Sequence, residues 1–110
     1  MNEARFIYVT CESEEQARTI GRSLVEERLA ACANILPGME SVYRWEGKIE
    51  TGRETVLILK TTADLVPSLT ARVKELHDYE VPCVVALIVD GGNPDYLSWI
   101  SEQTTGPTPA

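Results

Sequence analysis

Two kinds of hydrophobic pattern alternate along the chain. Short runs rich in β-branched and aromatic residues, which favour strands, occupy 5–11, 33–45, 54–61 and 84–89. Between them, hydrophobic side chains recur at three- and four-residue steps from Ala17 to Cys32 and from Val66 to Leu76, a spacing typical of amphipathic helices. The pattern therefore predicts the order strand, helix, strand, strand, helix, strand.

Capping residues indicate where the helices begin. Ser13 followed by Gln16 is a capping box for the first helix, in which the two side chains satisfy free backbone N–H groups. Asp64 is the expected N-cap of the second helix. Asn93 followed by Pro94 combines a cap with a proline at the first helical position, and so predicts a short helix near the C-terminal end.

These elements define the expected fold class. Pro37-Gly38 should bend the second strand, because proline donates no hydrogen bond to a ladder, and Glu46-Gly47 should turn it into the third. The order predicts an α+β, ferredoxin-like βαββαβ sandwich with an extended hairpin, a C-terminal helix and an antiparallel sheet of order 4-1-3-2. We expect a single domain over residues 1–110, with an ordered core from about 5 to 103 and a flexible tail at 104–110.

Composition narrows the range of partners. With 17 acidic and 10 basic residues the formal net charge is −7, so the positive surface that nucleic acid or an anionic membrane requires is missing. The same acidity is compatible with cation handling, although it is also a common means of keeping a small protein soluble. No secretory signal or bilayer-length apolar run is present in the sequence, and we therefore expect a cytoplasmic protein.

The three cysteines are odd in number and widely spaced, without a CxxC pair, which disfavours a disulfide framework or a zinc knuckle. The phosphate-loop, dinucleotide, zincin and nucleophile-elbow motifs are also missing from the sequence. A hydrolytic pair of His77 with Cys11 or Cys83 is conceivable, but no third orienting residue can be named. The interpretation is a protein that is not an enzyme.

The predicted topology brings potential metal ligands to one edge of the sheet. Cys11 ends the first strand, His77 ends the second helix and Cys83 opens the fourth strand, whereas Cys32 falls at the opposite end. Thiolate and imidazole suit copper or zinc better than magnesium or calcium. The alternative is structural, because cysteines are often buried and a histidine near a helix C-terminus interacts favourably with the dipole.

A second feature is the aromatic hairpin. Tyr43, Trp45 and Ile49 lie on a ribbon that is longer than one subunit's sheet can pair, and long apolar edges are usually covered. We expect Tyr43, Trp45 and the adjacent Glu46 to lie at contacts between copies in a closed oligomer. The alternative is that the rings cover only their own subunit.

Four segments of the chain resemble a known protein family. The segments that carry the resemblance read ERLAACANILPGMESVYRWEGKIE, LILKTTADLVPSL, ELHDYEVP and ALIVDGGNPDYLSWI, and they are similar to the CutA divalent-cation tolerance proteins. The resemblance implies a homotrimer, similar in architecture to PII-type signalling proteins, that is linked to tolerance of divalent metals and binds Cu²⁺. It also implies ligand roles for His77 and Cys11. Asp78 and Cys83 depart from the family pattern HPYEVPE.

Together these observations predict a divalent-cation tolerance or metal-response protein that binds copper or a similar divalent ion through His77, Cys11 and Cys83 as a homotrimer. The alternative is a PII-like trimeric sensor or adaptor whose link to metal tolerance is indirect. Its clefts would bind a small anionic metabolite through four basic residues, Arg44, Lys48, Lys60 and Arg72.

Overall fold

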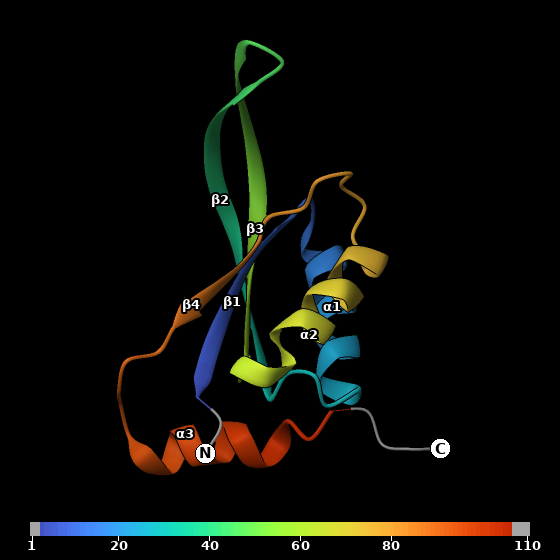
Figure 1. The fold of residues 1–110 in the computed structure, drawn as a ribbon. Helices are drawn as coiled ribbons and strands as arrows, with labels where there is room; N and C mark the ends of the chain where they lie inside the picture. The colour runs from blue at the N-terminus through green and yellow to red at the C-terminus, as the bar shows by residue number, and fades with distance from the viewer. Residues whose placement is uncertain (1–2, 107–110) are drawn as a thin grey trace.

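The computed structural model describes residues 3–106. Its elements follow one another as β1 (Ala4–Cys11), α1 (Glu14–Glu26), β2 (Cys32–Trp45), β3 (Lys48–Thr62), the short 3₁₀ turn η1 (Ala63–Leu65), α2 (Val66–Leu76), β4 (Val84–Ile88) and α3 (Pro94–Gln103). This is the predicted order of elements, including the C-terminal helix (Figure 1).

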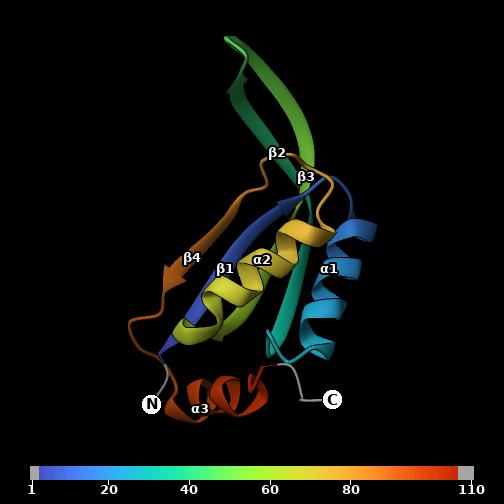
Figure 2. The ribbon, with the colours of Figure 1, turned by 45° about the vertical axis from the view of Figure 1, so that its right-hand side comes forward.

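The four strands form one antiparallel sheet in the order β2-β3-β1-β4, so the predicted order 4-1-3-2 is confirmed. Helices α1 and α2 cover one face of this sheet, and α3 lies across the end of the sheet nearest the N-terminus (Figures 1 and 2). The core lies between the sheet and the two helices, and its largest fully buried side chains include Ile7, Ile20, Leu24, Leu57, Leu59, Leu69 and Val73.

The hairpin of β2 and β3 extends well beyond the rest of the sheet (Figure 1). The ladder between β1 and β3 ends at the pair Cys11 and Thr55, whereas β3 continues to pair with β2 as far as Trp45 and Lys48. The turn residues Glu46 and Gly47 both have positive φ, 49° and 79°, as a two-residue hairpin turn of type I′ requires. The extended hairpin and its predicted turn are therefore confirmed.

The predicted bend in β2 is a local break in the ladder. Register shifts between Leu36 and Met39, and Gly38 between them has φ 80°, a backbone conformation that glycine adopts without steric cost. The bend redirects β2 so that its second half forms the extended part of the hairpin.

Two predicted helix boundaries are wrong. Helix α1 ends at Glu26 rather than continuing to Cys32, because Arg28 has φ 60° and the N–H groups of Leu29 and Ala30 both donate to the carbonyl of Leu24. The apolar run after this turn is buried, and burial, not helicity, explains its composition.

Asp64 does not cap α2. It lies in the 3₁₀ turn η1, where its carboxylate accepts a hydrogen bond from the hydroxyl of Thr62 at 2.6 Å. Helix α2 begins at Val66 without a side-chain cap, and the turn of 3₁₀ helix before it supplies the transition from β3.

The predicted flexible tail is described only in part. Thr104 is buried and its hydroxyl donates to the carbonyl of Ile100 at 2.6 Å. The Gly106 N–H donates to the carbonyl of Arg28 at 3.1 Å, so residues 104–106 pack against the domain. The remainder of that prediction, 107–110, lies outside the described residues.

Candidate functional site

His77 joins the end of α2 to the end of β1. Its Nε2 lies 2.7 Å from the carbonyl oxygen of Thr10, and its Nδ1 accepts a hydrogen bond from the Tyr79 N–H at 3.1 Å. Because a carbonyl can only accept, Nε2 carries the proton and Nδ1 supplies the lone pair. The imidazole is 8% exposed, and both of its nitrogens are already used inside the subunit.

Cys11 is the last residue of β1 and belongs to the hydrophobic core, with no exposed surface. Burial, with a smaller contribution from the negative charge of Glu54, raises the pKa of the Cys11 thiol from 9.0 to about 11. Since the thiolate is the form that binds metals, a protonated core thiol is a poor ligand at neutral pH.

Cys83 lies immediately before β4 and is partly buried. It lines the same pocket as Thr10, whose carbonyl bonds His77, so the three predicted ligands do approach one edge of the sheet. Among residues 3–106, however, no group of three or more His, Cys, Asp or Glu side chains is arranged to hold a metal ion. The metal assignment of His77, Cys11 and Cys83 stays a prediction, and the residues present do not fit it in this arrangement.

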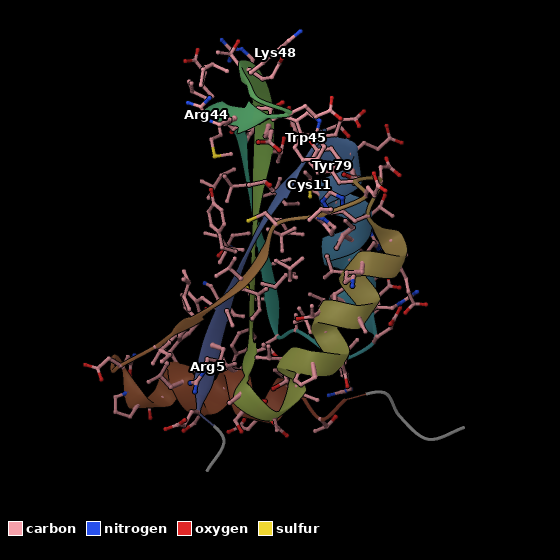
Figure 3. All side chains as sticks on the ribbon, turned by 45° about the horizontal axis from the view of Figure 1, so that its top comes forward. Arg5, Cys11, Arg44, Trp45, Lys48 and Tyr79 are labelled. Atoms are coloured by element: carbon pink, nitrogen blue, oxygen red, sulfur yellow. The ribbon has the colours of Figure 1, made fainter. Side chains whose placement is uncertain are left out.

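A pocket of about 340 Å³ opens where the hairpin leaves the sheet. Its walls come from β1, β2, β3 and the segment between α2 and β4, and are formed by Thr10, Tyr43, Trp45, Glu54, Tyr79, Glu80, Val81 and Cys83. Figure 3 shows Trp45 and Tyr79 in this region, with Cys11 beside them at the end of β1. We refer to these eight residues as the hairpin pocket.

A hydrogen-bond network fixes one wall of the hairpin pocket. Glu54 of β3 accepts from the Tyr79 hydroxyl at 3.1 Å and from the Ser41 hydroxyl at 2.8 Å. The ring of Tyr79 in turn packs against the His77 imidazole, with centroids 4.8 Å apart. Burial, together with the hydrogen bond and charge of Glu54, raises the pKa of Tyr79 to about 12. The chain from His77 through Tyr79 to Glu54 therefore holds the hairpin against the loop after α2.

Sequence reasoning missed Glu54 and Ser41. They lie 13 residues apart on facing strands, and Tyr79 is 25 residues from Glu54, so no local spacing marks them as partners. Ser41 pairs with Gly52 in the ladder and reaches Glu54 diagonally, two residues further along β3, so the strand pairing alone does not mark the two as partners.

The predicted contact residues lie on the extended hairpin. Tyr43 and Trp45 are 47% and 55% exposed in the single subunit, and, being two residues apart in a strand, they point to the same side. Both line the hairpin pocket. Glu46 forms the turn at the tip with φ 49°. Their role as contacts between copies stays a prediction.

The four basic residues of the alternative hypothesis do not gather in one place. Arg72 pairs with Glu27 of α1 at 2.9 Å, and the Lys60 ammonium donates to the Tyr96 hydroxyl at 2.9 Å. Arg44 and Lys48 lie at the far tip of the hairpin (Figure 3). A single anion site built from all four is therefore not formed within the subunit.

In the described part of the chain, no helix has the length and apolar composition needed to cross a membrane. Fold and site together define a ferredoxin-like α+β protein with an extended hairpin and a lined pocket at the hairpin's base. The model of the CutA1 divalent ion tolerance protein family matches residues 5–103, and the chain belongs to that family.

Individual relatives show the same assignment. The divalent-cation tolerance protein CutA of Thermus thermophilus is 52% identical over 89% of this chain and 95% of the relative. A solved structure of the Thermus thermophilus divalent cation tolerance protein superposes with a TM-score of 0.90, 50% identity and coverage of 92% of this chain and 98% of that chain. Protein CutA 1, chloroplastic, of Oryza sativa is 48% identical over 89% of this chain, which spans about half of the relative (55%).

Proposed function

We propose that this chain is a non-enzymatic protein of divalent-cation tolerance, acting in the cytoplasm as a homotrimer that binds Cu²⁺ or a similar divalent ion. Membership of the CutA1 divalent ion tolerance family supports the link to divalent cations. The net charge of −7 supports it as well, because a negative surface raises the local concentration of cations and repels nucleic acid and anionic membranes.

The observation that carries the assembly is the uncovered surface of the hairpin. Beyond the end of β1 the hairpin pairs only within itself, and its apolar side chains Val42, Trp45 and Ile49 are 72%, 55% and 60% exposed. The other edge strand, β4, exposes Ile88 at 76% and Leu87 at 50%. Long apolar edges of this kind are covered in stable proteins. Identical copies that each cover the next form a closed ring of a few subunits.

Copper would be the cargo of this assembly. Of the three predicted ligands, Cys83 alone keeps a partly exposed side chain without a described hydrogen bond, whereas His77 is bonded through both ring nitrogens and Cys11 is buried. We therefore assign the first contact with a soft ion to Cys83. His77 and Cys11 would contribute only after the contacts described above had broken.

Two measurements test the two parts separately. Light scattering coupled to size exclusion should give three times the 12.2 kDa chain mass, and a monomer would overturn the assembly. Calorimetric titration with Cu²⁺ should show saturable binding that Cys83→Ser weakens at least about tenfold, because loss of a ligand should cost no less than the roughly 10–100-fold loss typical of outer-shell partners. Cys32→Ser is the matched control, because Cys32 is also partly buried but lines a different pocket. Absent binding in the wild type, or equal loss in both variants, would overturn the copper assignment.

The alternative of a PII-like small-molecule sensor is favoured by one observation, the hairpin pocket itself. Its volume of about 340 Å³ falls at the small end of ordinary ligand sites. Its carboxylates Glu54 and Glu80, however, would repel the anionic metabolite that this alternative implies. A thermal-shift screen of nucleotides and organic acids checks it, and a stabilising anion would favour this alternative.

A further inference from the structure

The hairpin pocket combines aromatic faces with negative charge. Three of its eight lining residues, Tyr43, Trp45 and Tyr79, are aromatic, and two, Glu54 and Glu80, are acidic. Aromatic rings attract cations through the negative charge of their faces, and carboxylates attract cations directly. The pocket contains no Lys or Arg among its described lining residues. The rings and the carboxylates therefore both favour a cation, and no basic side chain on the described walls opposes it.

The charge of Glu54 is fixed in place but not neutralised. Its two carboxylate oxygens accept from the neutral hydroxyls of Ser41 and Tyr79. Within residues 3–106 its carboxylate takes part in none of the ion pairs. The same negative charge contributes to the raised pKa values of Cys11 and Tyr79, and Glu12 adds to that of Tyr79. The region is thus a preformed site of negative potential beside apolar walls.

We infer that the hairpin pocket binds a small organic ammonium ion, with its charge facing Glu54 and Glu80 and its apolar part against Tyr43 and Trp45. The volume of about 340 Å³ suits a ligand of a few to about ten heavy atoms. The Tyr79 N–H donates to His77 Nδ1, and this hydrogen bond fixes the loop that carries one wall of the pocket.

Two other occupants fit the pocket less well. A bare metal ion would use only the carboxylates and the Cys83 thiol, and would leave the three aromatic rings without a role. An anionic metabolite would meet two carboxylates and no cationic side chain on the described walls. An organic cation is the one class that uses both the rings and the charges.

The inference goes beyond the proposed role in metal tolerance and does not depend on copper binding. Tyr43 and Trp45 are also the residues assigned to contacts between copies, and the inference requires that their faces toward the pocket stay accessible in the assembled protein. Binding is therefore measured on the assembled full chain, and each variant is checked for its oligomeric state by light scattering.

Choline and its uncharged isostere 3,3-dimethylbutan-1-ol are the probes. In a Trp99→Phe background Trp45 is the remaining tryptophan, and its fluorescence should change saturably with choline. The isostere should bind about tenfold more weakly or not at all, since it lacks the charge that interacts with the rings and carboxylates. Equal responses to the two probes, or none to choline, would overturn the inference.

Variants locate the site. Glu54→Gln should weaken choline binding about tenfold, whereas Glu50→Gln, which removes the same charge from the same strand outside the pocket, should leave it unchanged. Glu80→Gln provides a second pocket variant, because Glu80 is exposed and its loss spares the Ser41 and Tyr79 hydrogen bonds. Unchanged affinity in both pocket variants would overturn the inference. Loss of choline binding with Cu²⁺ binding retained would support it and leave the metal proposal standing.

Discussion

The imidazole of His77 bonds the carbonyl of Thr10 at 2.7 Å, across 67 residues of sequence. The contact joins the C-terminal end of α2 to the C-terminal end of β1, at the point where the hairpin pocket opens. Because the second ring nitrogen accepts the Tyr79 N–H, one side chain satisfies two backbone groups at once.

His77→Ala should destabilise the fold. The substitution leaves the Thr10 carbonyl and the Tyr79 N–H without their partners, and an unsatisfied buried polar group costs about 1–3 kcal/mol. Urea unfolding followed by circular dichroism, at one fixed protein concentration, measures the free energy of unfolding. Lys74→Ala, on the exposed side of the same helix, should change it by less than about 0.5 kcal/mol. Equal stability of His77→Ala and wild type would show that the imidazole is not structural.

The pH dependence of stability should reflect the buried thiol of Cys11. Its pKa is about 11 in the folded protein against 9.0 for an unperturbed thiol, so between these values the unfolded chain has lost a proton that the folded chain retains. The free energy of unfolding should therefore fall as pH rises from about 9 to about 11. The stabilising contribution of the protonated Cys11 thiol should be fully present below about pH 9.

Cys11→Ala isolates this contribution from those of other groups that titrate at high pH. Below about pH 9 the variant should be less stable than the wild type by a constant amount, because a small cavity replaces the sulfur. Between about pH 9 and pH 11 its stability should fall less steeply than that of the wild type, so the difference should narrow. Parallel pH profiles for the two proteins would contradict a raised pKa for Cys11. Iodoacetamide labelling at pH 8 offers a second readout, with Cys83 and Cys32 reacting well before Cys11.

Much of the fold could be predicted because residues close together in the sequence determine where helices begin and where hairpins turn. The Ser13 hydroxyl accepts the Gln16 N–H at 3.1 Å, and the Gln16 side chain accepts the Glu12 N–H at 3.3 Å, close to the expected capping box. Glu46-Gly47 turns the hairpin with the two positive φ values that such a turn requires. Periodicity failed at the end of α1, because a buried turn and a buried helical turn place apolar residues at similar spacing.

The candidate site was less accessible to prediction. Topology correctly brought Cys11, His77 and Cys83 toward one edge, but it gave no information on what each side chain bonds. The imidazole is satisfied by backbone groups and the thiol of Cys11 faces the core. Ser41 pairs with Gly52 and bonds Glu54 diagonally across the two strands, a side-chain contact that the strand pairing alone does not specify.

Ile49→Glu should shift the protein toward smaller species. Ile49 is 60% exposed on the extended hairpin, so its substitution removes no core packing, and a charge buried at a contact between copies is strongly unfavourable. Light scattering across a dilution series reads the mass directly. Val25→Glu, at a 38% exposed position on α1 away from the hairpin, should leave the mass unchanged. An unaltered mass for Ile49→Glu would exclude this part of the hairpin from the assembly contact.

Gly21→Ala should destabilise the protein although alanine is the better helix former. In an open helix position the change would favour the helix by about 1 kcal/mol. Here the added Cβ would lie 2.9 Å from the Ala33 Cβ and 3.3 Å from Leu57 Cδ1. The first of these contacts is with an atom fixed to the backbone of β2, so α1 must move away from the sheet, at a net cost of about 1–3 kcal/mol. Urea unfolding measures the change, and Thr19→Ala, exposed on the same helix, should instead gain a few tenths of a kcal/mol. A Gly21→Ala protein as stable as the wild type would mean that α1 packs less closely on β2 than these distances require.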